Sequence, residues 1–223
     1  MNENARERMI RHRLPDRILH WVNAFSVLIL LVTSFFPILG LKFAWVTFHW
    51  IAGLTLTLAV LLHIIRRLVW KNLRLMLIEV LDLRNAWRVA RQIVSLKDAE
   101  SNKPGKYTLP QKLFHHAAAA VILVSVVTGL LMMVRVDTPL WQRNPYWLSD
   151  QTWGFIYVLH GLAAMTLVTF IMVHIYFALR PENLWITRSM IFGWISHENY
   201  LSKHDPNRWP AESVEMHPEG FTP

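Results

Sequence analysis

Residues 153–179 read WGFIYVLHGLAAMTLVTFIMVHIYFAL, an apolar run that contains two histidines, His160 and His174. As a helix, a run of this length crosses a hydrocarbon layer about 30 Å thick. The histidines are fourteen residues apart, which places them roughly 21 Å apart along the axis and within about 40° of one face. An imidazole inside a membrane is costly and usually functional, so the pair predicts metal-ligand positions at two depths of one helix.

Three further apolar runs are long enough to cross a membrane. The 223 residues are 53% hydrophobic, with a mean hydropathy of +0.27. We expect spans at about residues 21–41, 44–68, 113–134 and 153–179. The predicted fold is therefore all-α, a membrane-spanning four-helix bundle in residues 1–200. A cytoplasmic surface helix is expected within residues 70–95, and residues 201–223 are expected to form an irregular cytoplasmic tail.

Lysine and arginine are distributed unevenly between the connections. Residues 1–20 hold five of them, residues 66–112 hold eleven and the tail from residue 180 holds four, whereas the other two connections together hold three. Because basic residues gather on the cytoplasmic side of membrane proteins, both termini are predicted to be cytoplasmic. This topology and the attraction to anionic lipid explain the net charge of +8, so no nucleic acid partner is expected.

The chain contains no cysteine but eleven histidines. Disulfides and iron–sulfur clusters with cysteine ligands are thereby excluded from this chain, and a metal must be held by histidine or methionine. Since histidine is present at suitable depths, the methionines of the third and fourth runs are expected to pack rather than to bind metal. These are Met132, Met133, Met165 and Met172.

The second run repeats the histidine spacing of the fourth. His49 and His63 are also fourteen residues apart. With alternating topology, His49 and His160 lie toward the outer face, and His63 and His174 lie toward the cytoplasmic face. His20, at the cytoplasmic entrance of the first run, matches the depth of His174. Depth-matched histidines on several spans indicate ligand pairs rather than isolated packing residues.

A b-type haem with two axial imidazoles needs facing histidines and room for the macrocycle. The spacing predicts two haem b groups, one held by His49 and His160, the other by His174 and either His20 or His63. Small residues in these runs would leave the room: Gly53, Gly161 and Ala163. A haem-free transporter or scaffold that uses its histidines as a proton relay is the alternative of another class.

These residues also carry a family resemblance. His20-Trp21, His49 followed by Gly53, and His160 with His174 resemble the prokaryotic cytochrome b561 superfamily, most closely the gamma subunit of respiratory formate dehydrogenases. Further similar segments surround the third run: Lys106-Tyr107, Gln111-Lys112 and Val127-Thr128-Gly129. The resemblance covers about residues 10–210 in order and spacing.

The resemblance implies a di-haem cytochrome b in a bacterial cytoplasmic (inner) membrane. Such a subunit anchors an extracytoplasmic oxidoreductase, takes electrons from its Fe–S subunit and exchanges them with quinone, either menaquinone or ubiquinone. It has no substrate dehydrogenase activity alone. Quinone reduction near the cytoplasmic face is expected; the same anchor running in reverse, to feed a reductase of a sulfur compound, is the alternative.

The resemblance also implies roles for individual residues. It favours His20 over His63 as the partner of His174, which leaves His63 beside a haem propionate or the quinone. Arg66 is expected in the same vicinity. The family's quinone site lies near the inner haem and the start of the third run, and three polar residues map there: Thr108, Gln111 and Lys112. Pro110 stands where the formate dehydrogenase pattern has glycine.

Overall fold

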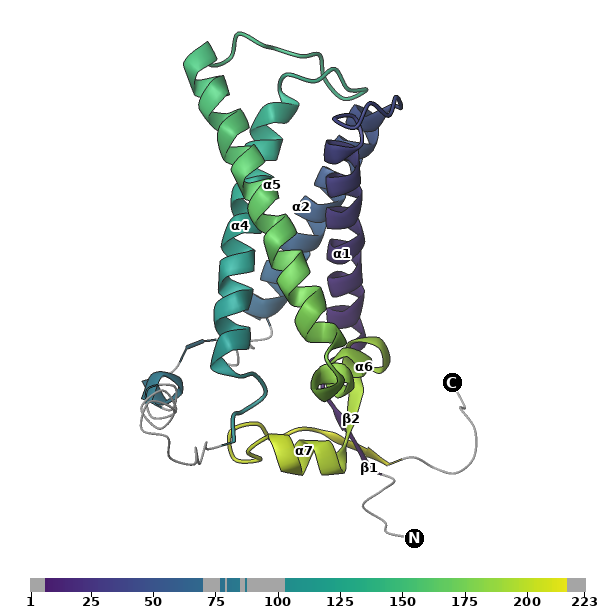
Figure 1. The fold of residues 1–223 in the computed structure, drawn as a ribbon, viewed down its shortest axis with the longest axis vertical. Helices are drawn as coiled ribbons and strands as arrows, with labels where there is room; N and C mark the ends of the chain where they lie inside the picture. The colour runs from purple at the N-terminus through teal and green to yellow at the C-terminus, as the bar shows by residue number, and fades with distance from the viewer. Residues whose placement is uncertain (1–6, 70–76, 79, 85–86, 88–102, 216–223) are drawn as a thin grey trace. The chain divides into compact units, whose positions relative to one another are not determined.

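The computed structural model describes residues 7–69, 77–78, 80–84, 87 and 103–215 (Figure 1). Two compact units make up these residues. The membrane unit consists of Ile18–Val69 and His116–Tyr176, and the terminal unit consists of the described parts of Met1–Arg17, Trp70–His115 and Phe177–Pro223.

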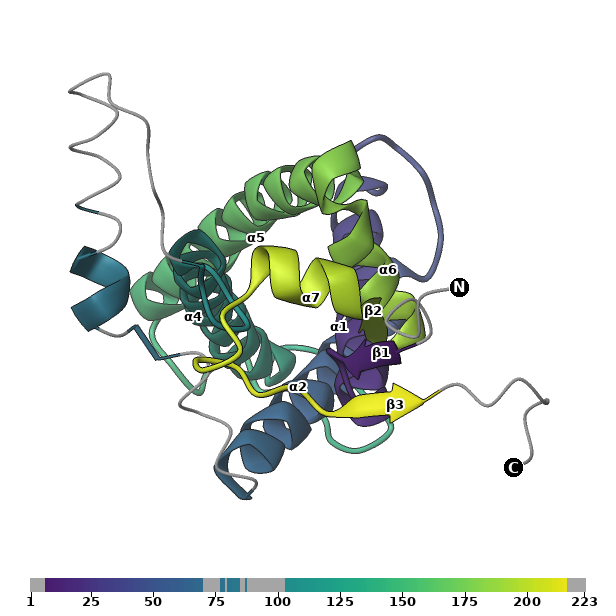
Figure 2. The same cartoon turned by 90° about the horizontal axis from the view of Figure 1, so that it is seen from below.

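Four long helices run through the membrane unit: α1 (Leu14–Phe35), α2 (Trp45–Val69), α4 (Leu109–Met133) and α5 (Asp150–Leu179). Among the described residues, these are the four helices that are long and apolar enough to cross a membrane. Seen from below, the parts of these helices within the membrane unit surround a common centre (Figure 2). The predicted four-span helical fold is confirmed, although α1 begins earlier than expected, at Leu14.

The sides of these helices are unusually open. In each helix, between 11% and 17% of the most apolar window is buried. Large apolar residues such as Leu58 and Leu162 are 59% and 61% exposed. Soluble proteins rarely expose a continuous apolar surface of this size. The exposed surface is therefore the one that hydrocarbon covers, as expected for a multi-pass membrane protein.

Local signals set the ends of the helices. Ser149 precedes α5, and its hydroxyl accepts a hydrogen bond from the Thr152 backbone N–H at 3.3 Å, as an N-cap does. Before α4, the Thr108 backbone N–H donates to Gln111 Oε1 at 3.0 Å, which is one half of a capping box. Thr108 and Gln111 thus begin the helix on which the third span lies.

A small antiparallel sheet organises the terminal unit. Strand β1 (Glu7–Ile10) lies between β2 (Trp194–Ser196) and β3 (Ser213–Glu215). The 3₁₀ helix η3 (Pro181–Asn183), α6 (Leu184–Phe192) and α7 (His197–Lys203) complete the unit. Its apolar core consists of Met9, Ile195, Tyr200 and Trp209.

Gly193 makes the sharp turn between α6 and β2. Its φ of 92° is left-handed, and a Cβ at this position would lie 2.8 Å from the His12 carbonyl oxygen. The Gly193 carbonyl in turn accepts backbone hydrogen bonds from Arg11 and His12 at 2.8 and 2.9 Å. Glycine alone satisfies both the backbone conformation and the close approach of the N-terminal segment.

The sequence did not predict this sheet, so the all-α description is incomplete. The tail is also more regular than expected, since α7 continues to Lys203 and residues 213–215 form β3. Most of residues 70–95, where a surface helix is expected, lie outside the described residues. Within this range, residues 80–84 and 87 are helical.

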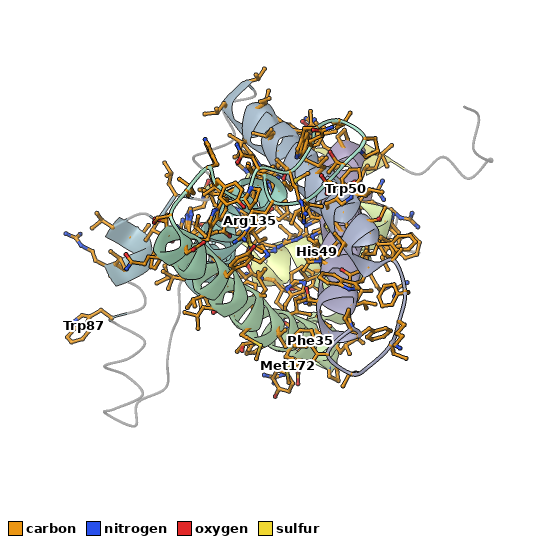
Figure 3. All side chains as sticks on the ribbon, turned by 90° about the horizontal axis from the view of Figure 1, so that it is seen from above. Phe35, His49, Trp50, Trp87, Arg135 and Met172 are labelled. Atoms are coloured by element: carbon orange, nitrogen blue, oxygen red, sulfur yellow. The ribbon has the colours of Figure 1, made fainter. Side chains whose placement is uncertain are left out.

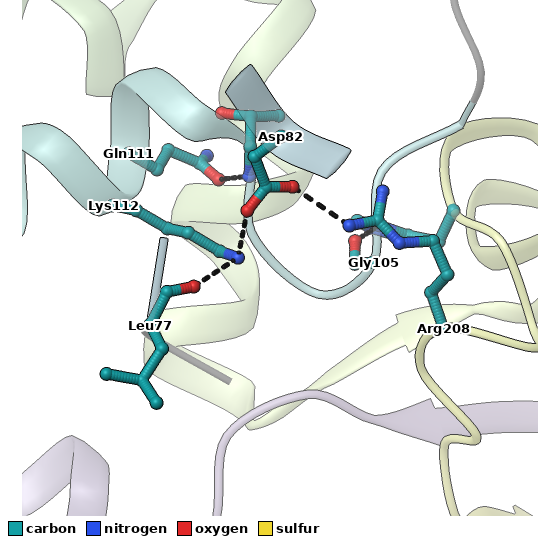
Figure 4. Close-up of polar contacts among 8 residues, drawn as sticks. Leu77, Asp82, Gly105, Gln111, Lys112 and Arg208 are labelled. Atoms are coloured by element: carbon teal, nitrogen blue, oxygen red, sulfur yellow. Dashed lines mark hydrogen bonds and ion pairs between the residues drawn. The ribbon is translucent and has the colours of Figure 1, made fainter. Parts of the chain in front are cut away.

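Asp82 joins three segments of the terminal unit (Figure 4). Its carboxylate accepts from Lys112 Nζ at 2.6 Å and from an Arg208 guanidinium nitrogen at 2.9 Å. Lys112 Nζ also donates to the Leu77 carbonyl at 2.8 Å. The Asp82 and Lys112 side chains are 6% and 5% exposed, so each charge depends on the other for stabilisation.

Replacing Asp82 by Asn should strongly destabilise the terminal unit, because it leaves the Lys112 ammonium buried without its carboxylate. Breaking one side of a buried pair costs about 3–5 kcal/mol. The melting temperature of the full chain in detergent, followed by tryptophan fluorescence, measures the loss. The control Glu212→Gln removes the Arg13 pair, whose side chains are both 63% exposed, and should cost less than about 1 kcal/mol. Equal effects would contradict the role of Asp82.

Arg11 and His204 form a second polar contact inside the terminal unit. Arg11 Nη1 donates to His204 Nε2 at 2.9 Å, and His204 Nδ1 donates to the Gly105 carbonyl at 2.7 Å. Because a guanidinium only donates, this geometry requires neutral His204. Burial and the neighbouring Arg11 charge lower the pKa of His204 to about 4.

The terminal unit should lose stability as the pH falls from about 6.5 toward 4. In this window the unfolded chain binds a proton at His204 and the folded chain does not, so protons favour unfolding. Melting temperatures at pH 7.5 and 4.5, read from tryptophan fluorescence, check the sign. The variant His204→Asn lacks the titrating ring and should show a smaller difference between the two pH values. A native chain that is equally stable at both would refute the assignment.

Candidate functional site

His49 and His160, the outer histidine pair, face each other within the membrane unit. His49 lies in the first turns of α2, and His160 lies about one third of the way along α5. Their ring centres are 6.3 Å apart, and the ring planes are inclined by 68°. Figure 3 shows His49 pointing between the helices, whereas Met172 lies on the outer side. Met172 is 67% exposed.

The inner histidine pair lies at the other end of α5. His20 on α1 and His174 on α5 have ring centres 6.2 Å apart, with planes inclined by 54°. Trp21 packs edge-on against His20 with 5.5 Å between ring centres. The structure therefore brings His174 opposite His20, one of the two partners that the sequence left open; His63 is a half-buried residue of α2.

Both separations fit a metal between two imidazoles. A ligating nitrogen lies about 2 Å from its metal and about 1 Å from its own ring centre, so the ring centres of two opposite ligands are about 6 Å apart. Among the described residues, no group of three or more His, Asp or Glu side chains could hold a metal ion. Two ligands on opposite sides fit an iron whose other four ligands come from a macrocycle.

The predicted small residues differ in their surroundings. A Cβ at Gly161 would meet no atom within 4 Å, and a Cβ at Gly53 would meet only Leu30 Cδ2 at 3.9 Å. Gly129 is different, because its Cβ would lie 3.3 Å from His160 Cε1. Ala163 is buried. Gly129 thus lets α4 approach the His160 ring closely.

Two threonines contact the outer pair. Thr33 Oγ1 lies 2.8 Å from His49 Nδ1, and Thr128 Oγ1 lies 2.8 Å from His160 Nδ1. Both threonines are buried. The sequence reasoning did not assign Thr33 a role and named Thr128 only within a motif, because threonine is common in apolar helices.

The other predicted site residues make local contacts. Thr108 and Gln111 cap α4, and Lys112 is held by Asp82. Arg66 is a half-buried residue of α2, one turn beyond His63. Their expected place beside a haem propionate or quinone stays a prediction.

Comparison with known proteins assigns the chain to a family. Residues 11–193 match the model of the family described as prokaryotic cytochrome b561. The chain is similar to the formate dehydrogenase cytochrome b556(fdo) subunit of Escherichia coli, with 29% identity over 93% of this chain and 94% of the relative. The formate dehydrogenase cytochrome b556 subunit of Haemophilus influenzae is 28% identical, over 93% of this chain and 84% of the relative.

A third relative is named for a different enzyme complex. The probable Ni/Fe-hydrogenase B-type cytochrome subunit of Bradyrhizobium diazoefficiens is 25% identical over 84% of either chain. The family match covers most of the chain and the whole of all four long helices. The protein is therefore a multi-pass membrane cytochrome b, an electron-transfer subunit that belongs to the prokaryotic cytochrome b561 family.

Proposed function

We propose that the chain holds two b-type haems and passes electrons between a partner oxidoreductase and quinone. The observation that carries this proposal is that four histidines face each other in two pairs, His49 with His160 and His20 with His174. Each pair has the ring separation that a shared iron needs. The ligands on α5 are fourteen residues apart, or roughly 21 Å along the helix.

When bound, the two haems would supply one-electron carriers at two depths of the membrane. The chain's own part is to hold each imidazole in place and to keep water and lipid from the metal positions. The buried residues of α2 and α5, Ala52, Leu56, Ala59, Ala163 and Leu167, lie between the two depths. An apolar surrounding of this kind controls solvent access and so contributes to the reduction potential.

We infer that the basic side of the chain is cytoplasmic, with both termini there. Twenty of the 23 lysines and arginines lie in the two terminal segments and in residues 66–112, which supports this orientation. The outer pair then lies toward the extracytoplasmic face and the inner pair toward the cytoplasm. Electrons would enter at the outer pair and reach quinone at the cytoplasmic end.

The partner is proposed to be an extracytoplasmic formate dehydrogenase with an Fe–S electron-transfer subunit. The support is that the Escherichia coli relative is a formate dehydrogenase subunit, and it is more similar over more of the chain than the hydrogenase relative. The outer loop between α4 and α5 also presents aromatic surface, with Tyr146 and Trp147 at 92% and 54% exposed. Tyrosine and tryptophan are enriched at protein interfaces.

Two alanine variants separate the haems. His160→Ala should remove one b-type haem and leave the other, which a quinol such as duroquinol should still reduce. His174→Ala should also remove one haem, but the haem that remains should no longer be reduced by quinol. Visible spectra of the purified chain, recorded with quinol and then with dithionite, measure both effects. This contrast follows from quinone exchange at the inner pair.

The variant His63→Ala serves as the control, because His174 faces His20 in the structure. It should keep two haems. Loss of a haem in His63→Ala, or of both haems in His160→Ala, would contradict the ligand assignment. Equal reduction by quinol in His160→Ala and His174→Ala would contradict the position of quinone exchange.

A further inference from the structure

Each histidine of the outer pair contacts a threonine, and the two threonines lie on different helices. Thr33 comes from α1 and contacts His49, whereas Thr128 comes from α4 and contacts His160. Both oxygen–nitrogen distances are 2.8 Å, and the threonines are 3% and 4% exposed. A pair of buried, matched contacts on opposite sides of one site needs a common explanation.

The direction of these hydrogen bonds follows from the threonine hydroxyls. Thr33 Oγ1 lies 2.7 Å from the Ile29 carbonyl, and Thr128 Oγ1 lies 2.7 Å from the Val124 carbonyl. A carbonyl cannot donate, so the single hydroxyl proton points to it. The same helical bond occurs at Thr166 and is ordinary for threonine. The hydroxyl can then only accept from the imidazole, so Nδ1 of each histidine carries the proton.

We propose that Thr33 and Thr128 are positioning residues that fix His49 and His160 in the tautomer with a free Nε2. That nitrogen is then the one available to the metal on each ring. An acceptor on Nδ1–H holds the ring orientation and raises the basicity of the ligating nitrogen. A more basic ligand stabilises the ferric state, so the threonines lower the reduction potential of the outer haem. This inference rests on the proposed function, because it needs a haem at the outer pair.

The test uses the full chain with its haems in detergent and compares Val with Ser. Thr33→Val and Thr128→Val keep the shape of the side chain and remove the acceptor, whereas Thr33→Ser and Thr128→Ser keep it. Redox titration followed in the visible spectrum resolves the outer and inner components, which are assigned with His160→Ala. Each Val variant should shift the outer component to higher potential and weaken haem retention there, about tenfold or more. The inner component should stay unchanged.

Thr166→Val is the matched control, because it removes the same helical hydrogen bond at a half-buried position of α5. It should titrate like the native chain. Loss of the outer haem in a Val variant supports the proposal if the Ser variant restores it. A Ser variant that behaves like its Val counterpart, or Val variants with native potentials and haem content, would overturn it. A native chain without two components would instead refute the proposed function.

Discussion

A polar side chain in a hydrocarbon layer must find its partner within the protein, and this constraint shapes the membrane unit. His20, His49, His160 and His174 meet it in pairs across the helices, with ring centres 6.2 and 6.3 Å apart. Unligated imidazoles would carry a desolvation cost at each of these positions. Iron between the rings would use the nitrogen lone pairs, and the threonines accept the remaining N–H of the outer pair. Helix position, ring orientation and metal chemistry are thus set by one requirement.

In the terminal unit, outside the apolar spans, buried charged groups also find their partners within the protein. Asp82 is bound by Lys112 and Arg208, and Arg11 is bound by His204 and the Lys106 carbonyl. These contacts join the N-terminal segment, the connection before α4 and the C-terminal segment. Buried charges of this kind contribute little net stability but make the loss of one partner costly. Some of the basic residues on which the proposed orientation rests therefore also hold the terminal unit together.

Much of the architecture could be predicted because it follows from local sequence patterns. Apolar runs of sufficient length identified the four spans, and the repeated spacing of fourteen residues indicated the depths of the histidines. The sheet could not be predicted, since β1, β2 and β3 have three or four residues each and come from distant parts of the chain. Such short strands carry no clear alternation. Whether His20 or His63 faces His174 also depends on helix rotation, which spacing alone does not fix.

The contacts of Thr33 and Thr128 escaped prediction for a different reason. A threonine in an apolar helix ordinarily bonds its own backbone, as Thr57 and Thr166 do. Only the approach of a second helix turns the spare lone pair of the hydroxyl toward an imidazole. Lys112 also gained a partner that the sequence did not indicate, because its ammonium contacts Asp82; its place beside a cofactor stays a prediction. Sequence patterns locate polar residues, and tertiary packing decides which group each one meets.

The most direct test of the account is the amount of haem b and of iron per polypeptide in the purified chain. The two facing histidine pairs predict about two haems b and two irons per chain, with the spectrum of low-spin haem bound by two histidines. One haem per chain would contradict the equivalence of the two pairs. A colourless chain would contradict the electron-transfer function and would favour a haem-free transporter or scaffold.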